Sequence, residues 1–158
     1  MRLTKNFTYE ELIASPTAKR FGIDNSPSKT AAGNLQMLAN EILQPIRDAY
    51  GKSIVVSSGF RCPRLNAAVG GSATSDHKFG CAADIRSMSD TPTDNRKLWR
   101  VVVDLWKAGK LPRLKQCINE YGFDWVHVSI QDGRTSKLGE FLDAKRINKK
   151  TTYSSSGI

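Results

Sequence analysis

The sequence lacks long hydrophobic runs and has few cysteines. No window of 18 residues is apolar throughout, which excludes a membrane-spanning helix. Residues 1–6 show no apolar stretch behind their basic side chains, so no secretory signal is predicted. The three cysteines, Cys62, Cys81 and Cys117, contain no CxxC pair. This argues against a structural zinc knuckle or a disulfide framework, and it favours small thiols in a reducing compartment.

The charge balance is strongly positive, with 24 Lys and Arg against 15 Asp and Glu and a net charge of +9. Such a charge attracts anionic partners, which include nucleic acid, anionic lipid and acidic cell-wall polymer. A solvated, solubilising surface is an equally good explanation, because the basic residues are scattered. One cluster stands apart near the end of the chain: Lys145, Arg146, Lys149 and Lys150.

The length of 158 residues and the 39% hydrophobic content indicate one folded domain. Helices are predicted for residues 6–12, with Thr8 and Glu11 as a capping box, for residues 30–50, bent at Pro45, and from Thr93 or Asp94 to Gly109. Strands are predicted for residues 54–56, 82–86, 116–121 and 125–130, the last two as a hairpin. The polar segment 57–80 is predicted to be a functional loop. The order of these elements predicts an α+β domain with a small, mostly antiparallel sheet flanked by helices.

The predicted domain covers residues 1–133. Residues 134–158 are basic and then rich in serine and threonine, so they are predicted to form a partly flexible tail that frays.

The two histidines of the chain lie in segments where they are not needed for packing. In strand 125–130 the valines and Ile130 share one face, so His127 points to the other. In strand 82–86 Asp84 shares a face with Ala82 and Arg86. Gly80 would let the chain turn so that His77 folds back over that face. Two imidazoles and a carboxylate there suit a zinc ion with an open fourth position, although each residue alone has a simpler structural explanation.

A wider pattern supports the zinc interpretation. The pattern SxHxxGxAxD occupies residues 75–84, and the segment Asp124-Trp125-Val126-His127 follows about forty residues later. Together they resemble the zinc D-Ala-D-Ala metallopeptidases of peptidase family M15, which share the hedgehog/DD-peptidase fold. Residues 7–12, 43–47 and 57–66 also look like the single-domain, phage-type branch of that family. The resemblance covers roughly residues 6–131.

The resemblance implies a role for each matching residue. His77, Asp84 and His127 would be the ligands of Zn²⁺. Asp124, three residues before His127, would be the general base, with Glu120 as an alternative. Arg61 would polarise the substrate carbonyl and bind substrate.

Further expectations concern Ser75, Asp124 and Cys81. Ser75 would contact substrate near the metal. In a continuous strand, Asp124 would point toward the core, on the same face as Val126. It can therefore serve as a base only if the strand begins after it. Cys81 is expected to pack on the opposite strand face rather than to compete for the metal.

The function implied is a zinc metallopeptidase that hydrolyses peptidoglycan stem peptides. The activity would be that of an L-alanyl-D-glutamate endopeptidase or a D-Ala-D-Ala carboxypeptidase, acting as a monomeric phage lysin. It would be made in the cytoplasm of an infected bacterium and act on the cell wall in the periplasm, without binding nucleic acid. Two alternatives stay open at this point: a non-catalytic zinc-containing binding module of the same fold, and a basic nucleic-acid-binding protein. The positive charge is the only feature that supports the second alternative.

Overall fold

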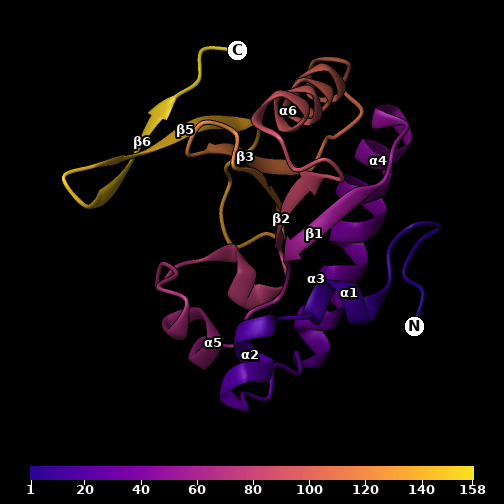
Figure 1. The fold of residues 1–158 in the computed structure, drawn as a ribbon. Helices are drawn as coiled ribbons and strands as arrows, with labels where there is room; N and C mark the ends of the chain where they lie inside the picture. Colours follow the sequence, from indigo (N-terminus) through magenta and orange to yellow (C-terminus); the bar gives the residue numbers. More distant parts are fainter.

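Six strands form one sheet in the order β1-β2-β4-β3-β5-β6 (Figure 1). The computed structural model describes residues 1–158. All neighbouring strands are antiparallel except β3 and β5, which are parallel. The strands are β1 (Ile54–Ser58), β2 (Ala82–Ser87), β3 (Leu114–Glu120), β4 (Trp125–Ile130), β5 (Glu140–Ile147) and β6 (Lys150–Ser155). The predicted α+β class with a mostly antiparallel sheet is confirmed.

Helices cover one face of this sheet and leave most of the other open. The main layer consists of α3, η1, α4 and α6, whose apolar side chains join those of the strands in one core of 25 buried residues. The helices are α1 (Tyr9–Ile13), α2 (Pro16–Phe21), α3 (Lys29–Leu38), η1 (Ala39–Leu43), α4 (Gln44–Tyr50), α5 (Pro63–Ala68), η2 (Asp76–Phe79) and α6 (Pro92–Lys107). None of them is long and apolar enough to cross a lipid bilayer.

The first predicted helix and the long helix are both present. Thr8 and Glu11 form the predicted capping box at the start of α1. The long helix runs through α3, η1 and α4, and its middle part, η1, is a π-helix that ends just before Pro45. Because proline has no N–H and its ring crowds the carbonyl four residues earlier, the wider π turn accommodates it without ending the helix.

Two predictions needed correction along the chain. The segment 57–80 is not only a loop, since it contains the short helices α5 and η2. The cap of α6 is Thr91, whose side chain accepts a hydrogen bond from the backbone N–H of Asp94, so this helix begins earlier than predicted. Proline at the first helical position explains the shift, because its fixed φ suits a helix start.

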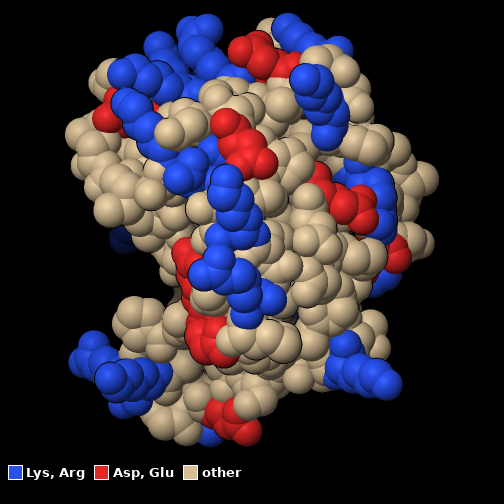
Figure 2. Space-filling model, turned by 90° about the vertical axis from the view of Figure 1, so that its right-hand side faces the viewer, with Lys and Arg blue, Asp and Glu red and all other residues tan.

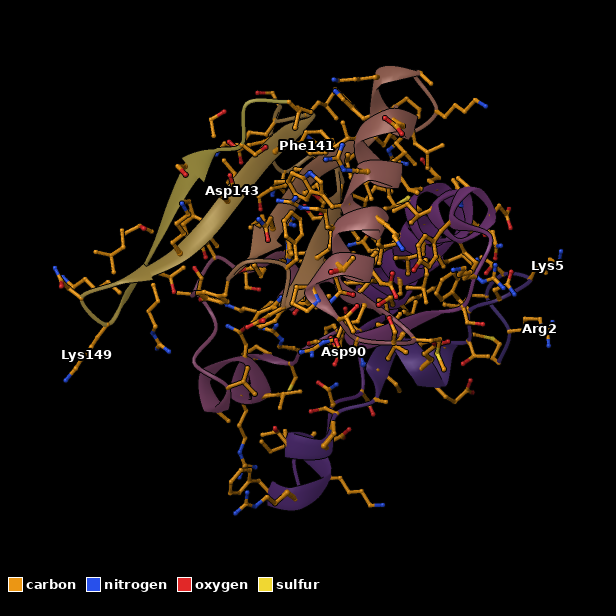
Figure 3. The ribbon with its side chains drawn as sticks, turned by 45° about the horizontal axis from the view of Figure 1, so that its top comes forward. Arg2, Lys5, Asp90, Phe141, Asp143 and Lys149 are labelled. Atoms are coloured by element: carbon orange, nitrogen blue, oxygen red, sulfur yellow. The ribbon has the colours of Figure 1, made fainter.

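The C-terminal residues differ most from the prediction. They form the strands β5 and β6, which extend the sheet beside β3, instead of a frayed tail. Phe141 anchors β5, since its ring packs on Trp99 and Trp106 of α6 with ring centroids 5.5 and 6.5 Å apart (Figure 3). Asn148 and Lys149 have positive φ angles of 50° and 64° and form the tight turn between the strands.

The central strands β2 and β4 each have an apolar and a polar face, as predicted. Val126, Val128 and Ile130 lie in the core together with Ala83 and Ile85. The polar side chains of both strands therefore face the open side of the sheet, where the helices leave room for a site.

Gly80 holds the turn between η2 and β2. Its φ is +71°, and a Cβ atom there would lie 2.3 Å from the carbonyl oxygen of Ala31. We expect Gly80→Ala to destabilise the fold by about 1–2 kcal/mol through its left-handed backbone and by a further ~1–3 kcal/mol through the clash. Gly122→Ala is the matched control, because Gly122 has a φ of +73° and open space around it. Urea denaturation of both variants measures the difference, and equal losses would contradict the clash.

Candidate metal centre

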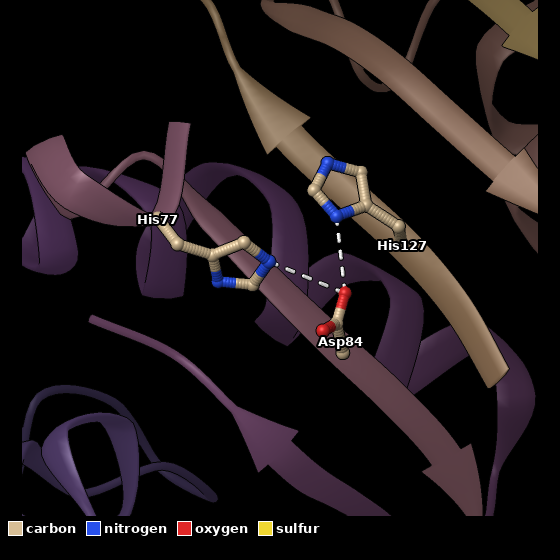
Figure 4. Close-up of side chains that lie close together, drawn as sticks. All are labelled: His77, Asp84 and His127. Carbon is tan, nitrogen blue, oxygen red and sulfur yellow. Dashed lines mark hydrogen bonds and ion pairs between the residues drawn. The ribbon is translucent and has the colours of Figure 1, made fainter. Parts of the chain in front are cut away.

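His77, Asp84 and His127 converge on the open face of the sheet (Figure 4). Asp84 on β2 and His127 on β4 are direct cross-strand partners, and His77 comes from η2. Oδ1 of Asp84 lies 3.3 Å from Nε2 of His77 and 3.0 Å from Nδ1 of His127. All three side chains are buried, and one potential ligand atom from each lies within 4.8 Å of the others. The structure thus brings together the three residues that the sequence analysis selected.

The orientation of the His77 ring is fixed by the backbone. Its Nδ1 lies 2.7 Å from the carbonyl oxygen of Gly59. A carbonyl oxygen only accepts hydrogen bonds, so Nδ1 carries a proton, and Nε2 is the ring nitrogen that faces Asp84. A hydrogen bond from Arg61 N to the carbonyl oxygen of His77, at 3.0 Å, holds the backbone of η2 beside the segment that follows β1. Such outer contacts orient the ligands of metal sites.

The Asp84 carboxylate is ionised in this setting. Burial alone would raise its pKa, but the adjacent His77 and His127 imidazoles outweigh burial and hold the pKa of Asp84 well below its usual range. Arg61 adds a hydrogen bond from Nη2 to Oδ2 of Asp84 at 3.2 Å. A charged carboxylate is therefore available at neutral pH without a proton to displace.

These donors fit a zinc ion. Two imidazole nitrogens and one carboxylate oxygen are the usual protein ligands of a catalytic zinc site, in which a fourth position stays open. Ligand atoms bound tetrahedrally at about 2.0–2.1 Å lie about 3.3 Å from one another. The contacts of 3.3 and 3.0 Å to Asp84 already approach this spacing.

The three residues lie in a cleft of about 690 Å³. Its floor is the open face of the sheet, where the residue pairing places Asp84, His127, Ile118 and Leu142 in one row across β2, β4, β3 and β5. One wall is the loop of residues 69–75 after α5, and the opposite wall comes from residues 137–153, mainly the β5–β6 hairpin. The cleft therefore reaches from the metal ligands to the β5–β6 hairpin.

Comparison with known proteins identifies the family. The Peptidase M15 family model matches residues 5–111, which include His77, Asp84 and Arg61. The chain belongs to the peptidase M15 family. A segment of 86 residues, 51% of this chain, is 40% identical to a zinc D-Ala-D-Ala carboxypeptidase of Streptomyces albus G. The match spans 31% of that protein.

Arg61 lines the cleft of this M15 chain and is held from three sides. In addition to Asp84, its guanidinium donates to Oγ of Ser58 at 2.9 Å and to Oδ1 of Asn66 at 3.2 Å. These contacts fix a cation beside the metal ligands. Ser75 also lines the cleft, and its Oγ accepts a hydrogen bond from the N–H of His77 at 3.3 Å. Both residues therefore line the cleft that contains the metal ligands, and their contact with substrate stays a prediction.

Asp124 does not lie with the ligands. The strand β4 begins directly after it, as its role as a base would require, but its side chain is exposed and does not line the cleft. The carboxylate that does line the cleft belongs to Glu120, at the end of β3, and Glu120 is only 8% exposed. Since Glu120 pairs with Trp125, it shares the face of His127. The geometry favours Glu120, the alternative in the sequence analysis, over Asp124.

Glu120 holds its proton unusually well. Burial raises the pKa of Glu120 to about 7, and the negative charge of Asp84 adds to burial, while His127 and Arg61 act in the opposite direction. A carboxyl group with a pKa near neutrality both accepts and donates protons readily at physiological pH.

The ionised form of Glu120 should also lower the stability of the folded protein near neutral pH. Between its ordinary pKa of 4.5 and its raised pKa of about 7, the folded state keeps a proton that the unfolded chain releases. Stability therefore falls as the pH rises through this window. We expect Glu120→Gln to have a higher Tm than the wild type above pH 7, by about 2–4 °C for each kcal/mol regained, with no gain below about pH 4.5. Thermal melts of the metal-free proteins at both pH values measure it, and a gain independent of pH would contradict this explanation.

An ionic network around the buried Asp76 side chain also fixes η2. Asp76 accepts hydrogen bonds from Nζ of Lys115 at 2.7 and 2.9 Å and from Nη2 of Arg134 at 2.9 Å. The Arg134 guanidinium also lies 3.7 Å from the centre of the Phe79 ring. Since Asp76 and Phe79 flank His77, these contacts tie the metal-ligand helix to β3 and to the loop after β4. The sequence analysis missed this network, because Lys115 and Arg134 lie 39 and 58 residues from Asp76 along the chain.

The cysteines take no part in the site. Cys81 lies in the core, and its Sγ donates to Oδ2 of Asp132 at 3.3 Å. Burial, with the neighbouring Asp132 charge, raises the pKa of Cys81 to about 12. Its thiol is therefore neutral and packs on the face of β2 away from the ligands, as predicted. All three cysteines are free.

Proposed function

We propose that this chain is a zinc-dependent peptidase that hydrolyses peptide bonds of peptidoglycan stem peptides. The observation that carries the proposal is the joint placement of His77, Asp84 and His127 with Glu120 and Arg61 in one cleft of an M15 family member. The name of the Streptomyces albus G relative, a zinc D-Ala-D-Ala carboxypeptidase, supports both the metal and the class of substrate.

The chemistry follows from the positions of the side chains. His77, Asp84 and His127 would hold the zinc ion, which would supply Lewis acidity for the scissile carbonyl and for a water molecule whose pKa would fall toward ~7. Glu120 accepts the proton of the attacking water and returns it to the departing amine. Arg61 donates hydrogen bonds to the carbonyl oxygen as negative charge develops there. The contacts of Arg61 with Ser58 and Asn66 keep its guanidinium in place for this role.

The size of the cleft supports an endopeptidase over a carboxypeptidase. Besides the metal ligands, the cleft is lined by residues 69–75 and by the β5–β6 hairpin, and its volume is about 690 Å³. A cleft of this size has room for several residues of an extended peptide. Within this proposal the bond is the one between L-alanine and D-glutamate, and the protein acts on the cell wall in the periplasm as a monomeric phage lysin. The phage-type motifs of residues 7–12 and 57–66 support the last point.

The distribution of charge supports a cell-wall role over nucleic-acid binding. On the face that Figure 2 shows, acidic side chains interrupt the basic ones along the middle of the molecule. Several basic residues are neutralised by neighbours, among them Arg113 by Glu41 at 3.0 Å and Lys97 by Asp94 at 2.9 Å. A nucleic-acid site needs a continuous basic stripe instead.

The test is digestion of purified muropeptides followed by mass spectrometry of the products. We expect the zinc-loaded protein to cleave them, and we expect a chelator or His127→Ala to stop cleavage. Lysis of permeabilised Gram-negative cells, followed by turbidity, should respond in the same way. Intact muropeptides after incubation with the zinc-loaded wild type would overturn the proposal and favour a non-catalytic binding module.

A further inference from the structure

A row of residues runs across the sheet beside the metal ligands. The pairing places Trp125 of β4, Glu120 of β3, Ala144 of β5 and Tyr153 of β6 side by side. Trp125, Glu120 and Tyr153 all line the cleft. Ala144 lies between Glu120 and Tyr153 in this row, but it is buried and does not line the cleft. Trp125 and Tyr153 are three strand spacings apart, about 14 Å in a flat sheet.

A third aromatic residue completes this end of the cleft. Tyr121 lines the cleft, and its ring packs edge-on against Trp125, with ring centroids 5.4 Å apart. Its hydroxyl group lies 2.7 Å from Oγ1 of Thr151 on β6, which ties the hairpin to the end of β3. Tyr121 has a φ of +54°, which is rare for a residue with a side chain. Strained backbone of this kind is often found at functional sites.

Tyr153 faces the site although it lies on the outermost strand. Its side chain is exposed, with 57% of the residue accessible to solvent. Tyr153 lines the cleft together with Thr151, Glu120 and Asp84. Its phenol group therefore borders the same cleft as the metal ligands. An accessible aromatic ring in this position contributes nothing to the core, which leaves it free to contact a ligand.

We propose that Tyr121, Trp125 and Tyr153 form a subsite for an amino-sugar ring of the glycan strand. The proposal rests on the proposed function, because the glycan is the part of peptidoglycan that carries the stem peptide. A pyranose ring has apolar C–H faces and a polar rim. Aromatic rings beside polar groups, here Thr151 and Glu120, match both parts. A stem peptide of alanine, glutamate and a diamino acid offers no comparable flat apolar face.

The distances agree with this arrangement. Trp125 lies two residues from His127 on the same strand, a separation of about 7 Å. One extended peptide residue spans about 3.3–3.6 Å. A sugar against the rings of Trp125 and Tyr121 would therefore lie one or two peptide residues from the scissile bond. The subsite thus places the sugar-linked end of the stem peptide toward β6 and the rest toward residues 69–75.

The kinetic test compares two substrates that differ only in the sugar. One is the free, N-acetylated stem tetrapeptide, and the other is the same tetrapeptide on the N-acetylglucosaminyl-N-acetylmuramyl disaccharide. We expect the wild type to cleave the disaccharide peptide with a kcat/KM at least about tenfold higher, a ratio equivalent to ~1.4 kcal/mol. Tyr153→Ala should reduce this ratio toward one, whereas Tyr153→Phe should keep it. Thr152→Ala is the matched control, since Thr152 points to the opposite face of β6.

A binding test separates the subsite from catalysis. Titration of the metal-free wild type with the peptide-free disaccharide, followed by NMR, should shift the indole signal of Trp125, and Tyr153→Ala should weaken the binding. Equal kcat/KM for the two substrates, or a ratio unchanged in Tyr153→Ala, would overturn the sugar subsite and leave the peptidase in place. If the wild type cleaves neither substrate, the proposed function fails, and the titration alone decides whether the sugar binds: no shift at Trp125 overturns the subsite.

Discussion

Glu120→Gln should reduce kcat by about 10²–10⁴-fold, the usual contribution of a general base. The amide has nearly the shape of the carboxyl group, but it cannot accept the proton of the attacking water. Because Glu120 contacts none of the three metal-ligand side chains through a hydrogen bond, zinc affinity should stay close to that of the wild type. Muropeptide hydrolysis followed by chromatography, together with a zinc titration of the same preparation, measures both quantities.

Asp124→Asn is the matched control for this experiment, because it makes the same chemical change in an exposed side chain outside the cleft. Its kcat should stay within about twofold of the wild type, as expected of a surface substitution far from special features. If Asp124→Asn loses activity and Glu120→Gln keeps it, the assignment of the base is wrong and the sequence-based choice of Asp124 stands.

The pH profile gives a second measure of the same group. A base works only when it is deprotonated, so kcat/KM should rise with pH as Glu120 releases its proton. The pKa of Glu120 is about 7 in the metal-free protein, and a bound cation would lower it. The ascending limb should therefore lie at or below pH 7. It should be absent from the residual activity of Glu120→Gln.

The metal ligands could be selected from the sequence because local rules determine their positions. The alternation of side chains along β2 and β4 places Asp84 and His127 on the polar face, opposite Ala83 and Val128. Gly80 then turns the chain so that His77 reaches the same face. None of these steps depends on contacts between distant helices. The register between β2 and β4 could not be predicted from the sequence, and it is this register that makes Asp84 and His127 direct cross-strand partners.

The base could not be chosen by the same rules. The distance along the chain from His127 favoured Asp124, but residues 121–124 form a turn in which Tyr121, Gly122 and Phe123 all have positive φ. The turn breaks the alternation, and the Asp124 side chain ends up exposed. Glu120 precedes the turn and keeps the alternation of β3, so it faces the cleft with Ile118. Parity within one hairpin strand is therefore the signal that favours Glu120, and the choice between the two carboxylates stays a prediction for the variants above to test.

The C-terminal hairpin was missed because its order depends on tertiary contacts. Lysine, serine and threonine dominate residues 145–158, a composition that favours solvation over burial. The buried ring of Phe141 between two tryptophans of α6 and the parallel pairing with β3 compensate for this. Asn148 in the turn is a weak local signal that could have indicated a hairpin.

Asp84→Asn should abolish stabilisation by zinc as well as hydrolysis. A ligand present at 1,000 times its Kd stabilises a folded protein by ~4.1 kcal/mol. For a domain of this size, that corresponds to a rise in Tm of about 8–16 °C. We expect this rise for the wild type in thermal melts with and without zinc. In Asp84→Asn it should disappear, because the variant replaces the only anionic ligand by a weakly binding amide and leaves Arg61 without its charge partner.

Asp90→Asn is the control for Asp84→Asn, because Asp90 lies in the turn after β2 and its side chain is 49% exposed in an ion pair with Arg86. The loss of such an exposed pair costs ~0–1 kcal/mol, so this variant should melt near the wild type and keep the whole rise with zinc. An equal rise in Asp84→Asn would show that zinc binds elsewhere on the chain. The residues around His77 and His127 would then need another explanation for their burial, and the proposed hydrolysis would lose its electrophile.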